Sequence, residues 1–349
     1  MNRNLLALTA LSLAAGASHA YELPNLEGAE AQAALALFKA DRQLANTLSF
    51  QPPAPTPFDC AASEDEMATV AGIPQLSEKL RGEIEKKTRK AMREQGMDPN
   101  TTQTSYRDLV IVPMGGHCAD GKITNVGAEA KTFASYVSET RVNVKQVIAG
   151  KVVDATMVNT SQAARYSHQT IKAGGMEASA IMKMVNSSRQ MYADPELQKN
   201  SDEMNEKIGG FGTTKPLTTL MFLYNMGRTT VTFAEMDQPK VTGGLFGVNV
   251  ETVKALNTTV NTPLDEHHMM MRNYQNDGLM SESYMKDGVP HGPSVMYMDN
   301  YLKKAGMKLA DQLGMEDTKE VTINGRDMLV KTTCMQNGAL VKATTCPKD

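Results

Sequence analysis

Short turn signals between runs of β-branched residues constrain the fold of this chain more than any other feature of its sequence. Asn324-Gly325 lies between the runs at 321–323 and 328–330, and Asn337-Gly338 follows a few residues later. Asn-Gly is the strongest short hairpin signal, because both residues adopt the positive φ angles that a two-residue turn requires. Two such turns so close together predict a three-stranded meander near the C-terminus.

The same alternation of strand-like runs and turns occurs earlier in the chain. The runs at 217–224 and 229–233 flank residues 225–228, which predicts a hairpin. Between 133 and 158, β-branched residues are interrupted by Ala149-Gly150-Lys151, which predicts a second hairpin. Consecutive hairpins build an antiparallel sheet, so we expect a body of that kind.

Other segments carry apolar residues at the three-to-four spacing of an amphipathic helix. This spacing predicts helices over 28–48, about 74–95, 176–192, 197–208 and 301–314. The second of these ends in a basic stretch. We interpret that stretch as a solvated face that complements the helix dipole, with a docking site for an anionic lipid or polymer as the alternative.

Together these patterns predict an α+β fold, in which a helical N-terminal segment precedes a mainly antiparallel body of hairpins and meanders. The expected organisation has four parts. They are a signal peptide over 1–20, a helical region over 21–105 with a Pro-rich linker at 51–57, a mixed hairpin and helix region over 106–210, and a β-rich region over 211–349.

The first twenty residues have the organisation of a secretory signal peptide. Arg3 supplies a positive start, residues 5–15 form a short apolar run, and Ser18 and Ala20 occupy the small-residue positions before Tyr21. We therefore expect a periplasmic or secreted protein, with a buried N-terminal helix as the alternative. No later apolar run approaches the length of about 18 residues that a membrane span needs, so no transmembrane segment is expected.

Cysteine usage fits that compartment. The four cysteines are Cys60, Cys118, Cys334 and Cys346, and an even number in an oxidising compartment favours disulfides. Four cysteines allow three pairings. Proximity in the sequence favours Cys60 with Cys118 and Cys334 with Cys346. The spacings do not match zinc or redox motifs.

The most specific stretch is YQNDGLMSESYMKDGVPHGPSVMYMDNY, residues 274–301. It resembles the MORN-type repeat, in the bacterial variant found in YwqK-like antitoxins. Glycines in such a repeat permit tight turns and close strand approach. The resemblance implies an antiparallel sheet surface for partners. It also implies scaffold roles for Gly278, Tyr284, Gly288, His291, Gly292 and Tyr297.

A cluster of methionine and histidine follows Pro263. If this segment is a strand, His267, Met269 and Met271 share one face. Thioethers are soft ligands for Cu(I), and imidazole binds copper in both oxidation states. These residues therefore form a candidate copper site. The alternative is packing, because the chain contains 25 methionines and methionine is a flexible core filler.

Charge and motifs narrow the function further. The net charge of −3 argues against nucleic-acid binding, and the lack of Trp disfavours surfaces that stack sugars or bases. The sequence contains no P-loop, GxSxG or HExxH motif. We expect an exported, non-catalytic binding or scaffolding protein of the bacterial envelope, without a cofactor, that presents a sheet surface to a protein partner. The alternatives are a periplasmic Met/His copper-binding protein and a hydrolase without a recognised motif.

Overall fold

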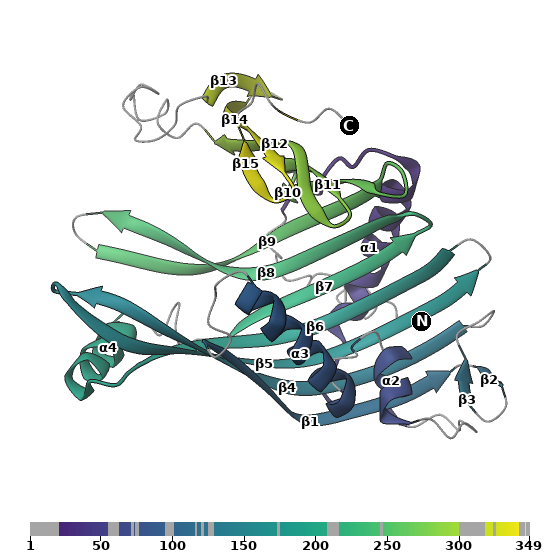
Figure 1. Cartoon of the computed structure of the whole chain (residues 1–349), viewed down its shortest axis with the longest axis horizontal. Helices are drawn as coiled ribbons and strands as arrows, with labels where there is room; N and C mark the ends of the chain where they lie inside the picture. Colours follow the sequence, from purple (N-terminus) through teal and green to yellow (C-terminus); the bar gives the residue numbers. More distant parts are fainter. Residues whose placement is uncertain are drawn as a thin grey trace, which may run out of the picture.

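The computed structural model of this chain is organised around one large antiparallel sheet (Figure 1). It describes residues 21–54, 63–70, 73, 77–94, 101–115, 117–119, 122–124, 129–172, 175–207, 216–244, 247–299, 318–323, 326–341 and 346. No helix within these ranges has both the length and the apolarity needed to cross a bilayer.

The sheet is a succession of neighbouring strands that follow the chain closely. In spatial order they are β1 (Thr102–Gly115), β4 (Glu129–Ile148), β5 (Lys151–Lys172), β6 (Gly175–Tyr192), β7 (Leu217–Met226), β8 (Thr229–Gly244), β9 (Gly247–Pro263), β10 (His268–Gln275), β11 (Gly278–Lys286), β12 (Val289–Asp299), β14 (Arg326–Gln336) and β13 (Thr318–Ile323), while β15 (Ala339–Val341) pairs with β14. The short strands β2 (His117–Ala119) and β3 (Lys122–Thr124) form a separate hairpin. The helices are α1 (Ala29–Asn46), α2 (Glu64–Val70), α3 (Glu78–Glu94) and α4 (Pro195–Lys207).

The predicted α+β class is wrong, because a 13-stranded sheet forms the body of the described residues and the helices lie at its faces and edges. The fold is predominantly β. The helices expected over 28–48, 74–95 and 197–208 are confirmed as α1, α3 and α4. The helix expected over 301–314 lies outside the described residues.

The helix predicted over 176–192 is also wrong, since this segment is strand β6. Its apolar residues fall at spacings that suit a helix, but Ile181 and Met182 point to opposite faces of a strand that is apolar on both. The sequence of such a segment is compatible with both the helical and the strand periodicity. The long ladders to β5 on one side and β7 on the other decide the conformation.

Both hairpins expected in the middle of the chain are confirmed. The turn at Ala149-Gly150 joins β4 to β5, and positive φ angles of 51° and 76° at these two residues close it. Gly227, with φ of 63°, lies in the turn between β7 and β8. Local turn chemistry therefore sets the register of the long strands.

The predicted C-terminal meander needs a correction. Strand β14 pairs with β13 along residues 326–331 and with β15 along 334–336, as the two Asn-Gly signals suggest. However, β12 pairs with residues 328–335 of β14 from the other side. Strands β13 and β15 therefore share one edge of β14 instead of flanking it, because β12 already occupies the opposite edge.

Helix α1 packs across one face of β6, β7 and β8, which we call the helix face. Phe38 of α1 stacks on Phe233 at 4.4 Å between ring centroids and meets Phe222 edge-on at 4.9 Å. The register places Phe222 beside Phe233 and also beside Ile181, so one row of buried side chains crosses three strands. This aromatic contact is the centre of the main hydrophobic core.

Polar contacts fix the N-terminal segment and α1 on that core. The Tyr21 hydroxyl donates to Glu235 Oε2 at 2.5 Å, and Arg42 Nε donates to the same oxygen at 2.8 Å. The Tyr224 hydroxyl donates to Asp41 at 2.8 Å. Burial, followed by these hydrogen bonds to carboxylates, raises the pKa of both Tyr21 and Tyr224 above the usual value. The two phenols therefore remain protonated donors at neutral pH.

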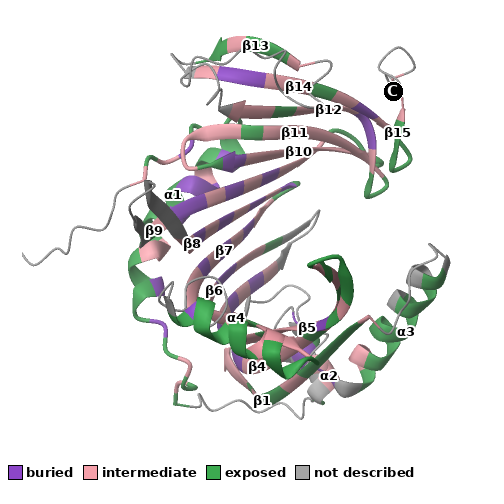
Figure 2. Cartoon of the chain, turned by 90° about the vertical axis from the view of Figure 1, so that its left-hand side faces the viewer, coloured by how far each residue is buried: buried purple, intermediate pink, exposed green. Residues whose placement is uncertain are grey.

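The opposite face of the sheet, which we call the open face, is concave. Figure 2 shows the sheet curling toward this face, with α1 on the outside of the curve. At one end of the sheet, the open face is covered by the segment containing α2 and α3. There Ile73 packs with Ala134, and the Arg81 guanidinium of α3 lies 5.7 Å from the centre of the Tyr106 ring.

We predict that replacing the central aromatic ring of α1 weakens the whole fold. Phe38→Ala leaves a cavity between α1 and two strands, so the free energy of unfolding should fall by about 3–5 kcal/mol. Leu37 on the same helix is 42% exposed, and Leu37→Ala should change that free energy by no more than about 0.5 kcal/mol. Urea unfolding of both variants checks this. Equal losses would show that α1 is not anchored through Phe38.

Candidate functional site

Strand methionines gather on the open face, whereas the aromatic rings of the central strands lie on the helix face. The register sets Met182 of β6 directly beside Met221 of β7, and Ile181 beside Phe222 on the reverse side. The pairing continues through β8 and β9 to β12 without exchanging the two faces. The methionines that this register places on the open face are Met157, Met182, Met184, Met221, Met236, Met269, Met271, Met285, Met296, Met298 and, through the pairing of β12 with β14, Met335.

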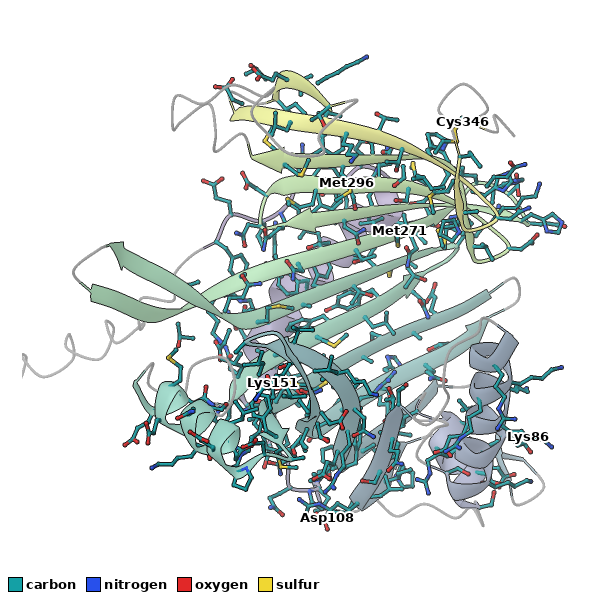
Figure 3. The ribbon with its side chains drawn as sticks, turned by 60° about the vertical axis from the view of Figure 1, so that its left-hand side comes forward. Lys86, Asp108, Lys151, Met271, Met296 and Cys346 are labelled. Atoms are coloured by element: carbon teal, nitrogen blue, oxygen red, sulfur yellow. A yellow bond between two sulfur atoms is a disulfide. The ribbon has the colours of Figure 1, made fainter. Side chains whose placement is uncertain are left out.

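The methionines of the open face are only partly buried, in contrast to the aromatic core. Phe222 and Phe233 have no exposed surface, whereas Met296 is 46% exposed and Met221 is half-buried. Figure 3 shows Met271 of β10 and Met296 of β12 in the same region of the sheet, where β11 separates the two strands. Side chains that remain half-exposed on a curved face are not filling a closed core, so this surface is available for contact with another molecule.

A polar hollow adjoins the methionines on the open face. It has a volume of about 320 Å³ and lies across β4, β5 and β6. Side chains with hydroxyl or amide groups supply most of its lining. The lining residues are Ser138, Thr140, Asn159, Thr160, Ser161, Asn186, Ser187, Ser188 and Leu217.

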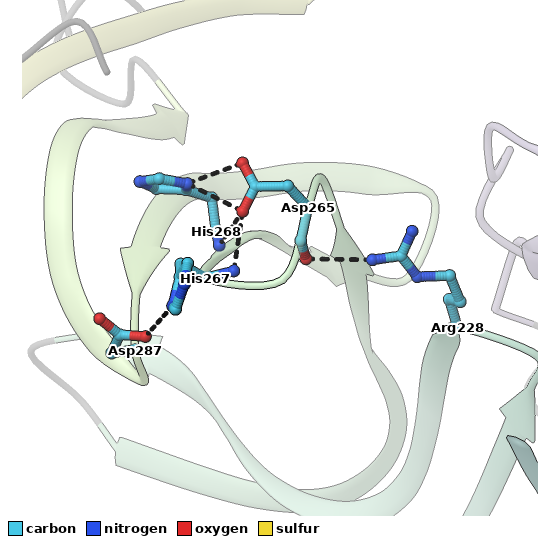
Figure 4. A network of polar contacts seen from close by, with 5 residues as sticks. All are labelled: Arg228, Asp265, His267, His268 and Asp287. Atoms are coloured by element: carbon cyan, nitrogen blue, oxygen red, sulfur yellow. Dashed lines mark hydrogen bonds and ion pairs between the residues drawn. The ribbon is translucent and has the colours of Figure 1, made fainter.

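The predicted copper ligands are only partly brought together. Met269 and Met271 lie on β10 and share the open face, as expected. His267 precedes the strand, is 65% exposed on its side chain, and has Nδ1 at 2.8 Å from Asp287 Oδ1 (Figure 4). The methionine that pairs directly with Met269 is Met285 of β11, which the sequence analysis did not include.

His267 belongs to a compact polar turn (Figure 4). Asp265 accepts hydrogen bonds from the backbone N–H groups of His267 and His268 at 2.7 and 2.8 Å, and its carboxylate lies 2.8 Å from His268 Nδ1. The bond from the His267 N–H, followed by those from His268, lowers the pKa of Asp265 to about 2. Arg228 donates to the Asp265 carbonyl at 3.0 Å. These contacts explain the histidines as parts of the turn.

Metal binding by harder ligands finds no support in the part of the chain that the structure describes. There, no three side chains among His, Cys, Asp and Glu are grouped so as to hold an ion. Thioether ligands are a different class, and Met269, Met271 and Met285 are the set that the register offers to a soft ion such as Cu(I).

The residues implied by the repeat resemblance fall on two consecutive strands, β11 and β12, and on the turn between them. Gly278 begins β11, Tyr284 lies on β11, Gly288 is in the turn to β12, and His291, Gly292 and Tyr297 lie on β12. Positive φ angles occur at Gly288 (78°) and Gly292 (99°), whereas Asn276 provides the positive φ before Gly278. The resemblance itself stays a prediction.

The His291-Gly292 pair has a clear structural role. His291 is buried, and its Nδ1 lies 3.1 Å from Asn337 Oδ1 in the turn between β14 and β15. A Cβ atom on Gly292 would lie 3.3 Å from Tyr284 Cβ. The absence of a side chain at Gly292 thus allows β12 to approach β11 closely.

One of the two expected disulfides is present. Cys334 of β14 is bonded to Cys346, which ties the C-terminal tail to the sheet. Cys60 lies outside the described residues, and Cys118 lies on β2 with a side chain that is not described. Pairing of Cys60 with Cys118 stays a prediction.

Sequence reasoning did not distinguish the open face from the helix face. Methionines two residues apart, as at 182/184 and 269/271, were a signal, because this spacing places both on one face of a strand. The helical interpretation of 176–192 obscured the pair at 182/184, while the pair at 269/271 was assigned to a copper site. Comparison with protein-family models, curated proteins and solved structures finds no match to this chain.

We predict that Gly292→Ala destabilises the protein by about 1–3 kcal/mol, because alanine disfavours its positive φ and the new methyl group crowds Tyr284. Gly82 in α3 has no atom within 4 Å of a built Cβ, so Gly82→Ala should be neutral or stabilise by up to about 1 kcal/mol. Thermal unfolding distinguishes the two variants. An unchanged midpoint for Gly292→Ala would contradict the close-approach role.

Proposed function

We propose that this chain is an exported, non-catalytic binding protein of the bacterial envelope that captures a partner through the open face of its sheet. The observation that carries this proposal is the separation of side chains between the two faces. Buried aromatic rings and α1 stabilise the fold on the helix face, while half-exposed methionines occupy the concave open face.

Methionine suits such a surface for physical reasons. Its unbranched side chain and polarisable sulfur adapt to partners of different shapes, as in other promiscuous apolar binding surfaces. When a partner covers this surface, the removal of apolar area from water stabilises the complex by roughly 25 cal/mol per Å² buried. The partner therefore presents apolar groups, and binding does not require a catalytic residue on this face.

We predict that the purified protein binds the uncharged apolar dye N-phenyl-1-naphthylamine and enhances its fluorescence. Met182, Met184 and Met221 form what we call the methionine row of β6 and β7 on the open face, so Met221→Glu places a charge where the dye would lie and should weaken binding at least about tenfold. Met221→Leu keeps the apolar volume and should bind like the parent protein.

Met204→Glu is the matched control, because Met204 lies on α4 and is 62% exposed. It should leave dye binding unchanged, and urea unfolding should confirm that each variant is folded. The absence of dye binding by the parent protein, or equal binding by Met221→Glu, would overturn the proposal.

Binding of Cu(I) is a second candidate function, favoured by one observation. Met269 and Met285 are direct cross-strand partners, and Met271 is two residues along β10 on the same face. Side chains in such positions have Cβ atoms about 5–8 Å apart, which brings three thioether sulfurs within reach of one ion. Cu(I) accepts soft sulfur ligands of this kind.

We predict that, if the protein binds Cu(I), Met269→Leu combined with Met285→Leu removes the site while His267→Ala retains it. The reason is that the His267 ring is engaged by Asp287 outside the strand. Anaerobic competition with a chromophoric Cu(I) chelator measures both affinities. Loss of binding in His267→Ala would favour the Met/His set instead, and a parent protein that fails to compete would exclude this function.

A further inference from the structure

The polar hollow on the open face is formed by an ordered array of side chains. The register pairs Ser138 with Ser161 and Ser161 with Asn186 across β4, β5 and β6. The next row on the same face pairs Thr140 with Asn159 and Asn159 with Ser188. Six hydroxyl and amide groups from three strands therefore surround one volume of about 320 Å³, close to the lower limit of small-molecule sites.

The chemistry of this lining selects an uncharged ligand. None of the side chains that line the hollow within the described residues carries a charge. An ionised group placed there would lose water without gaining a counter-ion, which is costly. Hydroxyl and amide groups both donate and accept hydrogen bonds, so they match a ligand group that bears several hydroxyls. Recognition would use hydrogen bonds, because none of the described residues that line the hollow is aromatic.

The hollow is continuous with the methionine row. Met184 lies two residues before Asn186 on β6 and on the same face, a distance of about 7 Å along the strand. Leu217 of β7 lies in the lining itself and pairs with Asn186. Met182 and Met221 follow in the next positions of the open face. A polar pocket and an apolar track thus lie end to end on one concave surface.

We propose that the open face binds a single amphiphile, with an uncharged, hydroxyl-rich head group in this hollow and an apolar chain along Met184, Met182 and Met221. The inference rests on the proposed function and names the class of partner. Protein interfaces rely on Trp, Tyr and Arg anchors in their centres. The hollow and the adjoining methionine row offer mainly hydroxyls, amides and thioethers, with Arg165 beside Met182 as the one described side chain of that anchor type that pairs directly with the row, which favours an amphiphile over a folded protein partner.

The test compares two detergents that share a dodecyl chain, each below its micelle concentration. Dodecyl maltoside has an uncharged sugar head, and dodecylphosphocholine has a zwitterionic head. Displacement of bound N-phenyl-1-naphthylamine should show dodecyl maltoside binding about tenfold more tightly, and this preference should disappear in Asn186→Leu because the amide contacts are lost.

Asn261→Leu is the matched control, since Asn261 lies on the open face of β9 outside the hollow. It should keep the preference for dodecyl maltoside. Equal affinities for the two detergents in the parent protein, or a preference that survives Asn186→Leu, would overturn the head-group assignment while leaving open-face binding intact. Free maltose that binds as tightly as dodecyl maltoside would overturn the amphiphile, because the chain would contribute nothing. Failure of the dye itself to bind would instead overturn the proposed function.

Discussion

The register of the antiparallel ladder is the constraint on which the rest of this structure depends. Because side chains alternate along each strand, one register assigns every residue of a continuous sheet to one of two faces. The row that contains Ile181, Phe222 and Phe233 becomes the helix face, and the row that contains Met182 and Met221 becomes the open face. A slip by one residue in β7 would place phenylalanine on the concave surface and methionine under α1.

The α1 contacts stabilise that assignment. Phe38 inserts between two strand aromatics, and the buried Glu235 carboxylate receives hydrogen bonds from Tyr21 and Arg42. A buried carboxylate without such partners would be strongly destabilising, so the start of the described chain and α1 are held to the same strand. Stability is thereby concentrated on one face. The methionines of the other face lie outside this main core.

This division changes the meaning of the methionine excess. As a property of composition, it suggested either a copper site or a substitute for aromatic core residues. In the structure, buried aromatic rings form the main core, and the strand methionines of the open face are only partly covered. The adjoining array of serine, threonine and asparagine makes one part of the concave surface polar, next to the apolar part formed by the methionines. His267 and His268, by contrast, are engaged by Asp287 and Asp265 at the start of β10.

The sequence by itself determined the local features: the turns at 149–150 and 227–228, the approximate positions of α1, α3 and α4, and the Cys334–Cys346 pair. These are set by φ preferences, helical spacing and proximity along the chain. Only the tertiary structure decided that 176–192 is a strand, that β13 and β15 share one edge of β14, and that Met285, not His267, accompanies Met269. Each of these outcomes depends on which neighbour occupies an edge or a face. Pairing between strands is a non-local interaction that the preferences of a single segment do not contain.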